Sequence, residues 1–373
     1  MGYRTQIIIE YANDWSCYGT IRCIFHYDHL ALNPNHQFVY VIGIEVKEIL
    51  ITGGAGFVGS HLCQKLLDDG HRLTVVDDES TGTRSNLEQF LGHEHFEFVN
   101  GDVSCPDLVD DLVDGKDHIY HLAAAVGVAL IARQPIATIE RNIHPTQLIL
   151  SSLRKQHEAG RTVRMFLAST SEVYGKNSKA TWNEQDDLVF GATTKARWSY
   201  GASKAIDEFL ALASYRQYGL PVVIGRFFNV VGPRQSGAYG MVLPRFVEAA
   251  LRNDPLVIHD DGQQTRCFAH VNDIVNAVVR LMDEQDAVGE VINIGSDHPI
   301  TIEQLAQRVI ALAGSSSQLQ YQSYREAYDE DFEDIRHRVP ELEKITRLIG
   351  NPITHDLDAI ITDVIADKKQ PSV

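Results

Sequence analysis

The stretch "ILITGGAGFVGSHL", residues 49–62, constrains the fold of this chain more than any other segment. It joins a short apolar run, typical of a buried strand, to an amphipathic pattern that predicts a helix from Phe57 to Asp69. Glycines at this junction permit a tight turn and let a pyrophosphate reach the first amides of the helix. The stretch therefore predicts a strand–loop–helix unit that binds a dinucleotide through Gly53, Gly56, Phe57, Val58 and Gly59.

Short apolar runs and amphipathic helical patterns alternate along the next part of the chain. Further strands are expected at 72–78, 96–102, 118–125, 163–170 and 221–229, and long helices at 136–158 and 199–218. This alternation is typical of a parallel sheet with helices on both faces. The predicted fold class is α/β: a Rossmann-type, doubly wound parallel sheet with a smaller C-terminal α/β lobe.

The change of pattern near Asn229 suggests where the parts divide. We expect the dinucleotide-binding domain to comprise residues 47–228, with 271–294 returning to it. The second lobe would comprise 229–270 and 295–373. Residues 1–46 precede the first strand and form an extension of unknown role.

Composition excludes several classes of protein. The formal net charge is −17 and no cluster of Lys and Arg is present, so a nucleic-acid partner is not expected. The five cysteines are odd in number and scattered, which favours reduced thiols. No signal peptide or spanning segment is recognised, so a cytoplasmic protein without a membrane partner is expected.

A metal site is not expected either. The pair that invites one, His118 and His121, lies in a strand-like run where a spacing of three places the side chains on opposite faces.

The end of the second strand indicates the cofactor. Asp77 follows Gly53 by some two dozen residues, which is where an acid binds the ribose hydroxyls of NAD. A second acid, Asp78, follows directly, and the nearest arginine, Arg84, lies beyond a turn. The additional phosphate of NADP would meet negative charge there, so NAD is predicted.

The segment "SYGASKAIDEFL" supplies a candidate base. Tyr200 and Lys204 are four residues apart on one face of a predicted helix. We expect the Lys204 ammonium to lower the pKa of Tyr200 and make it a base near neutral pH. Thr170, at the hydroxyl-rich end of the strand at 163–170, lies upstream of this pair.

Eight motifs, in this order, carry a family resemblance: "TGGAGFVGSHL", "VVDDESTG", "GDV", "YHLAA", "STSEVYG", "YGASK", "RFFNVVGPRQ" and "TRCFAHVNDI". From about Ile49 to near residue 350 the chain resembles extended short-chain dehydrogenases/reductases, the NAD-dependent nucleotide-sugar epimerases, dehydratases and decarboxylases. The resemblance implies that NAD stays bound, and that Tyr200 takes the proton of the sugar 4-hydroxyl while Thr170 holds that hydroxyl.

The resemblance also assigns binding residues. Asp102 and Val103 would flank the adenine, and Leu122, Ala123 and Ala124 would pass under the cofactor. A UDP-sugar would be bound by Ser171 and, from the second lobe, by Asn229, Arg245 and Arg266. A homodimer is implied, in which the helices near 136–158 and 199–218 pair with their copies as a four-helix bundle.

The triplet "TSE" suggests the branch of the family. Ser171 stands where dehydratases of this family carry an aspartate, and Glu172 stands where epimerases carry a small or hydroxyl residue. The triplet is similar to that of UDP-glucuronate decarboxylases, which oxidise C4 and then lose carbon dioxide. Arg338, in "EDIRHRVPEL", matches a late arginine of those enzymes.

Two alternatives stay open. The loop "AAAVGVALIARQP", residues 123–135, resembles the UDP-sugar 4-epimerases more closely. A non-catalytic, dinucleotide-sensing protein could share the fold.

The expected division of labour is that Tyr200 and Lys204 act during hydride transfer, and Glu172 and Arg338 after it. Alternation along a strand would place Thr170 and Glu172 on one face, toward one ligand.

Overall fold

The computed structural model describes residues 45–125, 135–237, 241–324 and 333–369. Residues Lys47–Val373 form one compact unit, distinct from Met1–Val46. The extension at 1–44 and most of the loop at 123–135 lie outside the described residues.

A seven-stranded sheet forms the centre of this unit, in the order β11-β6-β5-β4-β1-β2-β3. Every neighbouring pair in it is parallel. The strands are β1 (Glu48–Thr52), β2 (Arg72–Asp77), β3 (Phe96–Asn100), β4 (His118–His121), β5 (Arg164–Thr170), β6 (Val222–Phe227) and β11 (Val291–Ile294). The strand order reverses between β1 and β4, which is where such sheets open a crevice for ligands.

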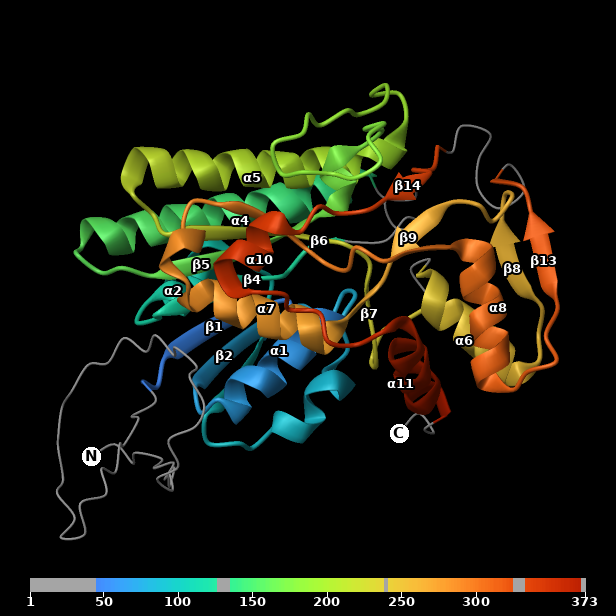
Figure 1. Ribbon diagram of the computed structural model, residues 1–373. Coiled ribbons are helices and arrows are strands. Elements are labelled where there is room, and N and C mark those ends of the chain that lie inside the picture. Colours follow the sequence, from blue (N-terminus) through green and yellow to red (C-terminus); the bar gives the residue numbers. More distant parts are fainter. Residues whose placement is uncertain (1–44, 126–134, 238–240, 325–332, 370–373) are drawn as a thin grey trace, which may run out of the picture. The chain divides into compact units, whose positions relative to one another are not determined.

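Helices cover both faces of this sheet (Figure 1). Three lie over one face: α2 (Pro106–Val113), α4 (Pro135–Glu158) and α5 (Ser199–Tyr218). Three others lie over the opposite face: α1 (Phe57–Asp68), α7 (Val271–Asp283) and α10 (Glu343–Ile349). Successive residues of β1 alternate between the two cores, Ile49 and Ile51 in one and Leu50 in the other. The predicted doubly wound fold is confirmed.

The smaller lobe follows β6, and its described residues form short strands and three helices. Its strands are β7 (Val230–Val231), β8 (Leu256–His259), β9 (Thr265–Cys267), β10 (Ala269–His270), β12 (Pro299–Thr301), β13 (Leu319–Gln322) and β14 (His337–Arg338). Its helices are α6 (Val242–Arg252), α8 (Ile302–Ala313) and α11 (Leu357–Lys369), which share one apolar core. Four 3₁₀ helices complete the described elements: η1 (Arg84–Phe90), η2 (Ser171–Tyr174), η3 (Ala196–Trp198) and η4 (Gln285–Ala287).

The chain returns to the large sheet after building part of this lobe. Strand β11 pairs with β6, and α7 packs beneath the sheet, although both follow β7–β10 in sequence. We therefore keep the division at residues 228, 270 and 294 as a proposal for the domain boundaries.

Several predicted strands end earlier than expected. The strand expected at 118–125 ends at His121, and the one expected at 96–102 ends at Asn100. In both cases the remaining residues leave the sheet and line a cavity at its carboxyl edge. The helix expected at 199–218 has those bounds.

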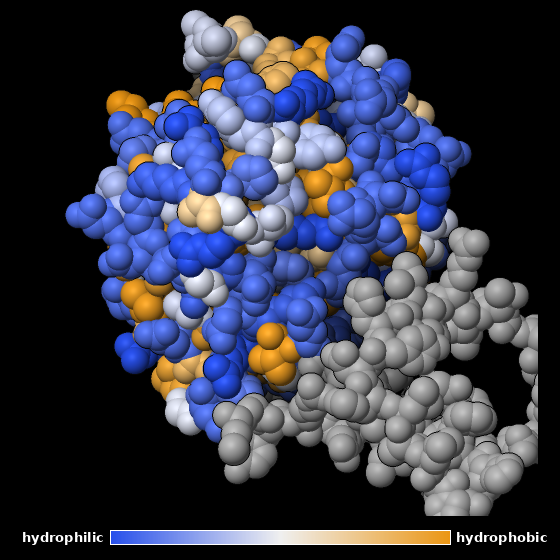
Figure 2. Space-filling view, turned by 90° about the vertical axis from the view of Figure 1, so that its left-hand side faces the viewer, coloured by the Kyte–Doolittle hydropathy of each residue, from blue (hydrophilic) through white to orange (hydrophobic). Residues whose placement is uncertain are grey.

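An apolar stripe runs along the outer face of α4 and α5. Ile136 and Ile139 are exposed on α4, and Ile206 and Phe209 are exposed on α5. Figure 2 shows a mostly hydrophilic face of the molecule with hydrophobic residues scattered over it, several of them near its upper edge. None of the described helices is both long and apolar enough to span a membrane.

Candidate active site

A cavity of about 570 Å³ opens between the carboxyl edge of the large sheet and the smaller lobe. Nearly all of the residues predicted to bind cofactor or substrate line it: Gly53, Gly56, Phe57, Val58, Gly59, Asp77, Asp102, Val103, Leu122, Ala123, Ala124, Thr170, Ser171, Glu172, Tyr200, Asn229, Arg245, Arg266 and Arg338. Lys204 is not among the lining residues. The structure thus brings predicted residues from ten separate segments of the chain together around one cavity.

The glycine loop has no room for a side chain at Gly53 or at Gly59. Gly53 has a φ of +74°, and a Cβ there would lie 2.7 Å from the backbone nitrogen of Ala123. A Cβ on Gly59 would collide with the Gly53 carbonyl oxygen. Helix α1 begins after Gly56 with no side-chain cap and no acid in its first turn. Its first amides remain available to an anion, as the pyrophosphate of NAD requires.

Asp77 is fixed at the end of β2. Its carboxylate accepts hydrogen bonds from the backbone N–H of Ala55 (3.0 Å) and of Glu79 (2.8 Å). Burial raises the pKa of Asp77 despite these bonds. Arg84 packs over the ring of Phe98 at 5.3 Å and does not line the cavity. The site therefore holds an acid for ribose hydroxyls and no arginine at this position for the phosphate of NADP, which fits NAD.

Tyr200 and Thr170 meet in the cavity, at the start of α5 and the end of β5. Their side chains share a hydrogen bond. Burial, and then the negative charge of Glu172, raise the pKa of Tyr200. Tyr200 is therefore protonated in this state, and its proton lies beside the hydroxyl predicted to hold the sugar.

The expected lowering of the Tyr200 pKa by Lys204 is not found. The Lys204 ammonium pairs with the Asp207 carboxylate at 2.9 Å, and their side chains are 2% and 0% exposed. A carboxylate this close offsets the field of the ammonium at Tyr200. Asp207 was not expected from the motif, although it lies three residues after Lys204 on the same helix face.

The alternation expected for Thr170 and Glu172 is wrong, because β5 ends at Thr170 and η2 begins at Ser171. The Thr170 hydroxyl caps this 3₁₀ helix by accepting a hydrogen bond from the backbone N–H of Glu172 (3.2 Å). Both side chains nevertheless line the cavity. The cap at Thr170, and not strand alternation, therefore places Glu172 near Tyr200.

Glu172 is held between two arginines. Its Oε1 lies 2.5 Å from Arg338 Nη1, and its Oε2 lies 2.6 Å from Arg197 Nη1. Burial alone would raise the pKa of Glu172, but the two guanidiniums outweigh it and lower the pKa to about 2. Burial, together with the charges of Arg266 and Arg197, lowers the pKa of Arg338 to about 10 although Glu172 opposes this.

Arg338 reaches this position through strand pairing. It lies on β14, in register with Arg266 on the parallel strand β9. Arg197, on η3, was missed by the sequence analysis. The only available signal was its position three residues before Tyr200, which does not reveal a partner 25 residues upstream.

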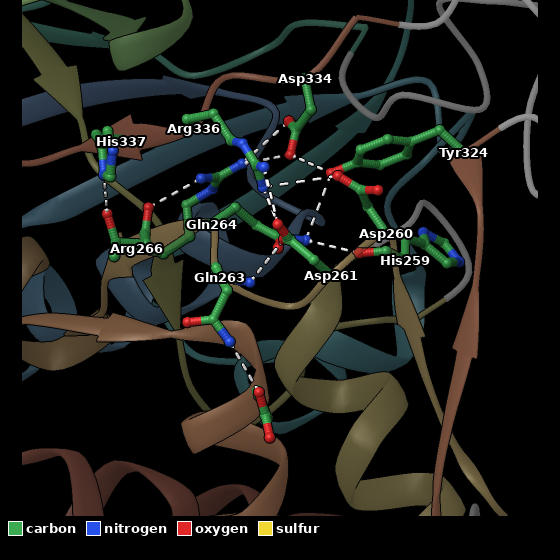
Figure 3. A network of polar contacts seen from close by, with 12 residues as sticks. His259, Asp260, Asp261, Gln263, Gln264, Arg266, Tyr324, Asp334, Arg336 and His337 are labelled. Atoms are coloured by element: carbon green, nitrogen blue, oxygen red, sulfur yellow. Dashed lines mark hydrogen bonds and ion pairs between the residues drawn. The ribbon is translucent and has the colours of Figure 1, made fainter.

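Arg266 belongs to a polar network at the far end of the cavity, shown in Figure 3. Its Nη2 contacts both oxygens of Asp334, at 3.0 and 3.1 Å, and Tyr324 donates a hydrogen bond to the same carboxylate at 2.6 Å. Asp334 and Tyr324 also line the cavity and were not predicted. Asn229, with a φ of +34°, donates to the carbonyl of Cys267 at 3.0 Å and is thereby tied to β9.

One group of potential metal ligands exists among the described residues: His270, His355 and Asp363. The two imidazoles stack with centroids 4.2 Å apart and planes at 21°. Ring nitrogens bind metals in the plane of the ring, so the lone pairs of stacked rings run side by side and do not converge. His355 Nδ1 is in addition 2.8 Å from Asp273 Oδ1.

Comparison with known proteins agrees with this geometry. Residues 49–295 match the model of the NAD dependent epimerase/dehydratase family. A UDP-N-acetyl-alpha-D-glucosaminuronate decarboxylase of Bacillus cytotoxicus is 40% identical over 81% of this chain and 91% of its own length. UDP-glucuronic acid decarboxylase 1 of Xenopus tropicalis is 38% identical over 82% of this chain and 68% of its own.

Solved structures show the same fold. The UDP-glucuronic acid 4-epimerase of Bacillus cereus, in complex with UDP-glucuronic acid and NAD, is 27% identical, with a TM-score of 0.76 over 86% of this chain and 99% of its own. The sequence comparison and the structural comparison therefore point to the same family for the chain that carries the glycine loop, Asp77 and the Thr170–Tyr200 contact. The protein belongs to the NAD-dependent epimerase/dehydratase family and is an NAD-dependent enzyme that modifies nucleotide sugars.

Proposed function

We propose that the enzyme is a UDP-glucuronate decarboxylase that oxidises the sugar at C4 and then releases the C6 carboxylate as carbon dioxide, giving a UDP-pentose. One observation carries the proposal. Among the described residues, the buried Nε of Arg338 has no hydrogen-bond partner, although Arg338 lines the cavity and its Nη1 contacts Glu172. A cationic N–H without a partner is costly to bury, and a substrate carboxylate would satisfy it.

The first half of the reaction uses Thr170 and Tyr200. Thr170 would hold the 4-hydroxyl, and Tyr200, once ionised, would take its proton as the C4 hydride leaves. Bound NAD would supply the chemistry that the protein lacks, by accepting this hydride and later returning it. Because burial raises the pKa of Tyr200, its ionisation needs positive charge nearby, and Lys204, four residues later on α5, is the residue that would supply it.

The second half would use Arg338, Arg197 and Glu172. A ketone at C4 makes the sugar a β-keto acid, so the C5–C6 bond can break with its electrons moving into an enolate on O4. The two arginines would orient the substrate carboxylate through ion pairs. Carbon dioxide is uncharged, so the arginines would no longer hold the group once the C5–C6 bond has broken. C5 would then take up a proton from a water molecule oriented by the Glu172 carboxylate, before the hydride and the Tyr200 proton return to C4.

The relatives support this reading. Both decarboxylases named above act, by their names, on UDP-linked uronic acids, at 40% and 38% identity. The name of the Bacillus cytotoxicus relative also makes the N-acetylated sugar a substrate to test.

A UDP-sugar 4-epimerase is the second candidate. The solved structure compared above is such an enzyme. The loop that suggests this reading, 123–135, lies mostly outside the described residues. An epimerase would perform the same C4 oxidation and then return the hydride to the other face.

Incubation of the purified enzyme with UDP-glucuronate, UDP-N-acetylglucosaminuronate and UDP-glucose, followed by mass analysis, separates these readings. The proposal expects a product lighter by one carbon dioxide from a uronic acid and none from UDP-glucose. A product of unchanged mass and altered chromatographic mobility would support the epimerase instead.

A further inference from the structure

Three separate segments carry the groups assigned to the reaction. Thr170 ends β5, Glu172 lies on η2, and Tyr200 begins α5. Their relative placement must be accurate, since misplacing a reacting group by about 1 Å can cost about 10²-fold in rate. The residues directly behind them form a buried polar cluster that joins all three segments.

The centre of this cluster is a two-pronged ion pair. Arg226, on β6, donates from Nε to Glu208 Oε1 (2.9 Å) and from Nη2 to Glu208 Oε2 (2.7 Å). Glu208 lies on α5, two turns after Tyr200. The Ser169 hydroxyl donates to Glu208 Oε1 at 2.5 Å, and Ser169 immediately precedes Thr170. One carboxylate therefore joins the end of β5 to the helix that carries Tyr200.

Arg226 extends the cluster to the third segment. Its guanidinium lies 4.6 Å from the centre of the Tyr174 ring, on the last residue of η2. The Tyr174 hydroxyl donates to Asn293 Oδ1 on β11 at 2.8 Å. Arg226 therefore also contacts η2, the 3₁₀ helix that carries Glu172.

None of Arg226, Glu208 and Tyr174 lines the cavity. Arg226 and Glu208 are each 4% exposed, and Tyr174 is fully buried. A buried ion pair adds little net stability compared with a well-packed apolar pair, but it fixes geometry. Ser169, which joins the cluster through Glu208, does line the cavity. Arg226, Glu208 and Tyr174 are therefore placed to orient the reacting groups and not to touch the substrate.

We propose that Arg226 and Glu208 are positioning residues that set the spacing of Thr170, Tyr200 and Glu172 for hydride transfer. This inference rests on the roles of those three residues under the proposed function. It concerns C4 oxidation, which the decarboxylase and epimerase readings share, so it can be tested on whichever UDP-sugar the enzyme oxidises.

The test compares Glu208→Gln, Ser169→Ala and their double variant in steady-state and rapid-mixing kinetics, with the holoenzyme and the UDP-sugar that the wild type turns over. We expect each single variant to lower kcat and the rate of NADH appearance at least about 10-fold while KM changes less than about threefold. Because both substitutions disturb one coupled network, Ser169–Glu208–Arg226, the loss in the double variant should fall short of the product of the two single losses.

Thr354→Val provides the matched control, because it removes a hydrogen bond (2.6 Å) to the buried Asp273, away from the cavity. It should lower the melting temperature and leave kcat unchanged. The proposal is overturned if the Glu208→Gln and Ser169→Ala variants keep wild-type kcat, if they change KM alone, or if their losses multiply in the double variant. If Glu208→Gln does not fold, Glu208→Asp is measured in its place, because Glu208 does not line the cavity whereas Ser169 does. A wild type that oxidises no UDP-sugar would instead refute the proposed function.

Discussion

The two ends of the cavity are built in different ways. The cofactor end relies mainly on backbone: a glycine loop, the uncapped amides of α1, and one acid whose carboxylate is held by two neighbouring N–H groups. The sugar end consists of charged side chains from distant segments, Arg197, Arg338 and Glu172, held by one another. The first end recognises a ligand by shape and can tolerate little added volume. The second presents charged groups that could exchange partners, which would suit the proposed reaction, in which a carboxylate enters and leaves as carbon dioxide.

Tyr200 stands where the two ends meet, and its loss should have the largest effect. We expect Tyr200→Phe to lower the rate of NAD reduction by at least about 10²-fold, because the proton acceptor for the 4-hydroxyl is removed. Cofactor and UDP-sugar should still bind. Rapid mixing with UDP-glucuronate, followed by NADH absorbance, checks this. Reduction at the wild-type rate would remove Tyr200 from the reaction.

Adding a methyl group at Gly53 should weaken the binding of NAD. Gly53→Ala places a Cβ 2.7 Å from the Ala123 nitrogen, so we expect NAD affinity to fall at least about 10-fold. Gly70→Ala is the matched control, since Gly70 also has a positive φ (+85°) but no atom within 4 Å of the added Cβ. Calorimetric titration of both apo-proteins with NAD separates crowding from backbone strain. Equal affinities in the two variants would contradict the shape argument.

The charged end should respond to acid. The pKa of Glu172 is lowered in the folded protein, from 4.5 to about 2, so its stabilising contribution is complete above about 4.5 and is lost as the pH falls toward 2. Glu172→Gln should flatten this part of the pH–stability curve. At neutral pH it should cost on the order of 3 kcal/mol, because two buried guanidiniums lose their acid.

Urea denaturation at several pH values measures this difference. Glu94→Gln, at an exposed acid, is the control and should leave the curve unchanged. A Glu172→Gln curve that runs parallel to that of the wild type would contradict the assignment of the ion pairs.

The smallest effect on chemistry is expected away from the cavity. The homodimer implied by the resemblance remains a prediction, now supported by Ile136 and Phe209, which are 72% and 68% exposed on the outer faces of α4 and α5. The wild type should sediment as two chains, and Phe209→Asp as one with NAD binding retained. Tyr321→Asp, at an exposed tyrosine on β13, should remain a dimer. A wild type that sediments as one chain would refute the dimer.

The contrast between the two ends also explains what the sequence could reveal. The glycine loop, Asp77 and the bounds of α5 follow from local patterns of turn, strand and helix, and the structure has them as predicted. Glu172 was assigned to the cavity, but by strand alternation, because a 3₁₀ helix four residues long has no period to detect. Arg197 was missed because its contact with Glu172 is made only when β5 and η3 are brought together in the fold. The Asp207 partner of Lys204 was detectable at a spacing of three but did not belong to the motif.

The most direct test of the account is a single-turnover experiment with Glu172→Gln and Arg338→Ala on UDP-glucuronate, observing NADH absorbance and released carbon dioxide together. Because these residues are assigned to the step after oxidation, NADH should appear in both variants and persist, while carbon dioxide release slows by about 10-fold or more. The wild type should release carbon dioxide and return to its oxidised absorbance. Full turnover by Glu172→Gln, or a wild type that yields only the 4-epimer, would contradict the decarboxylase account and leave Glu172 a structural acid between two arginines.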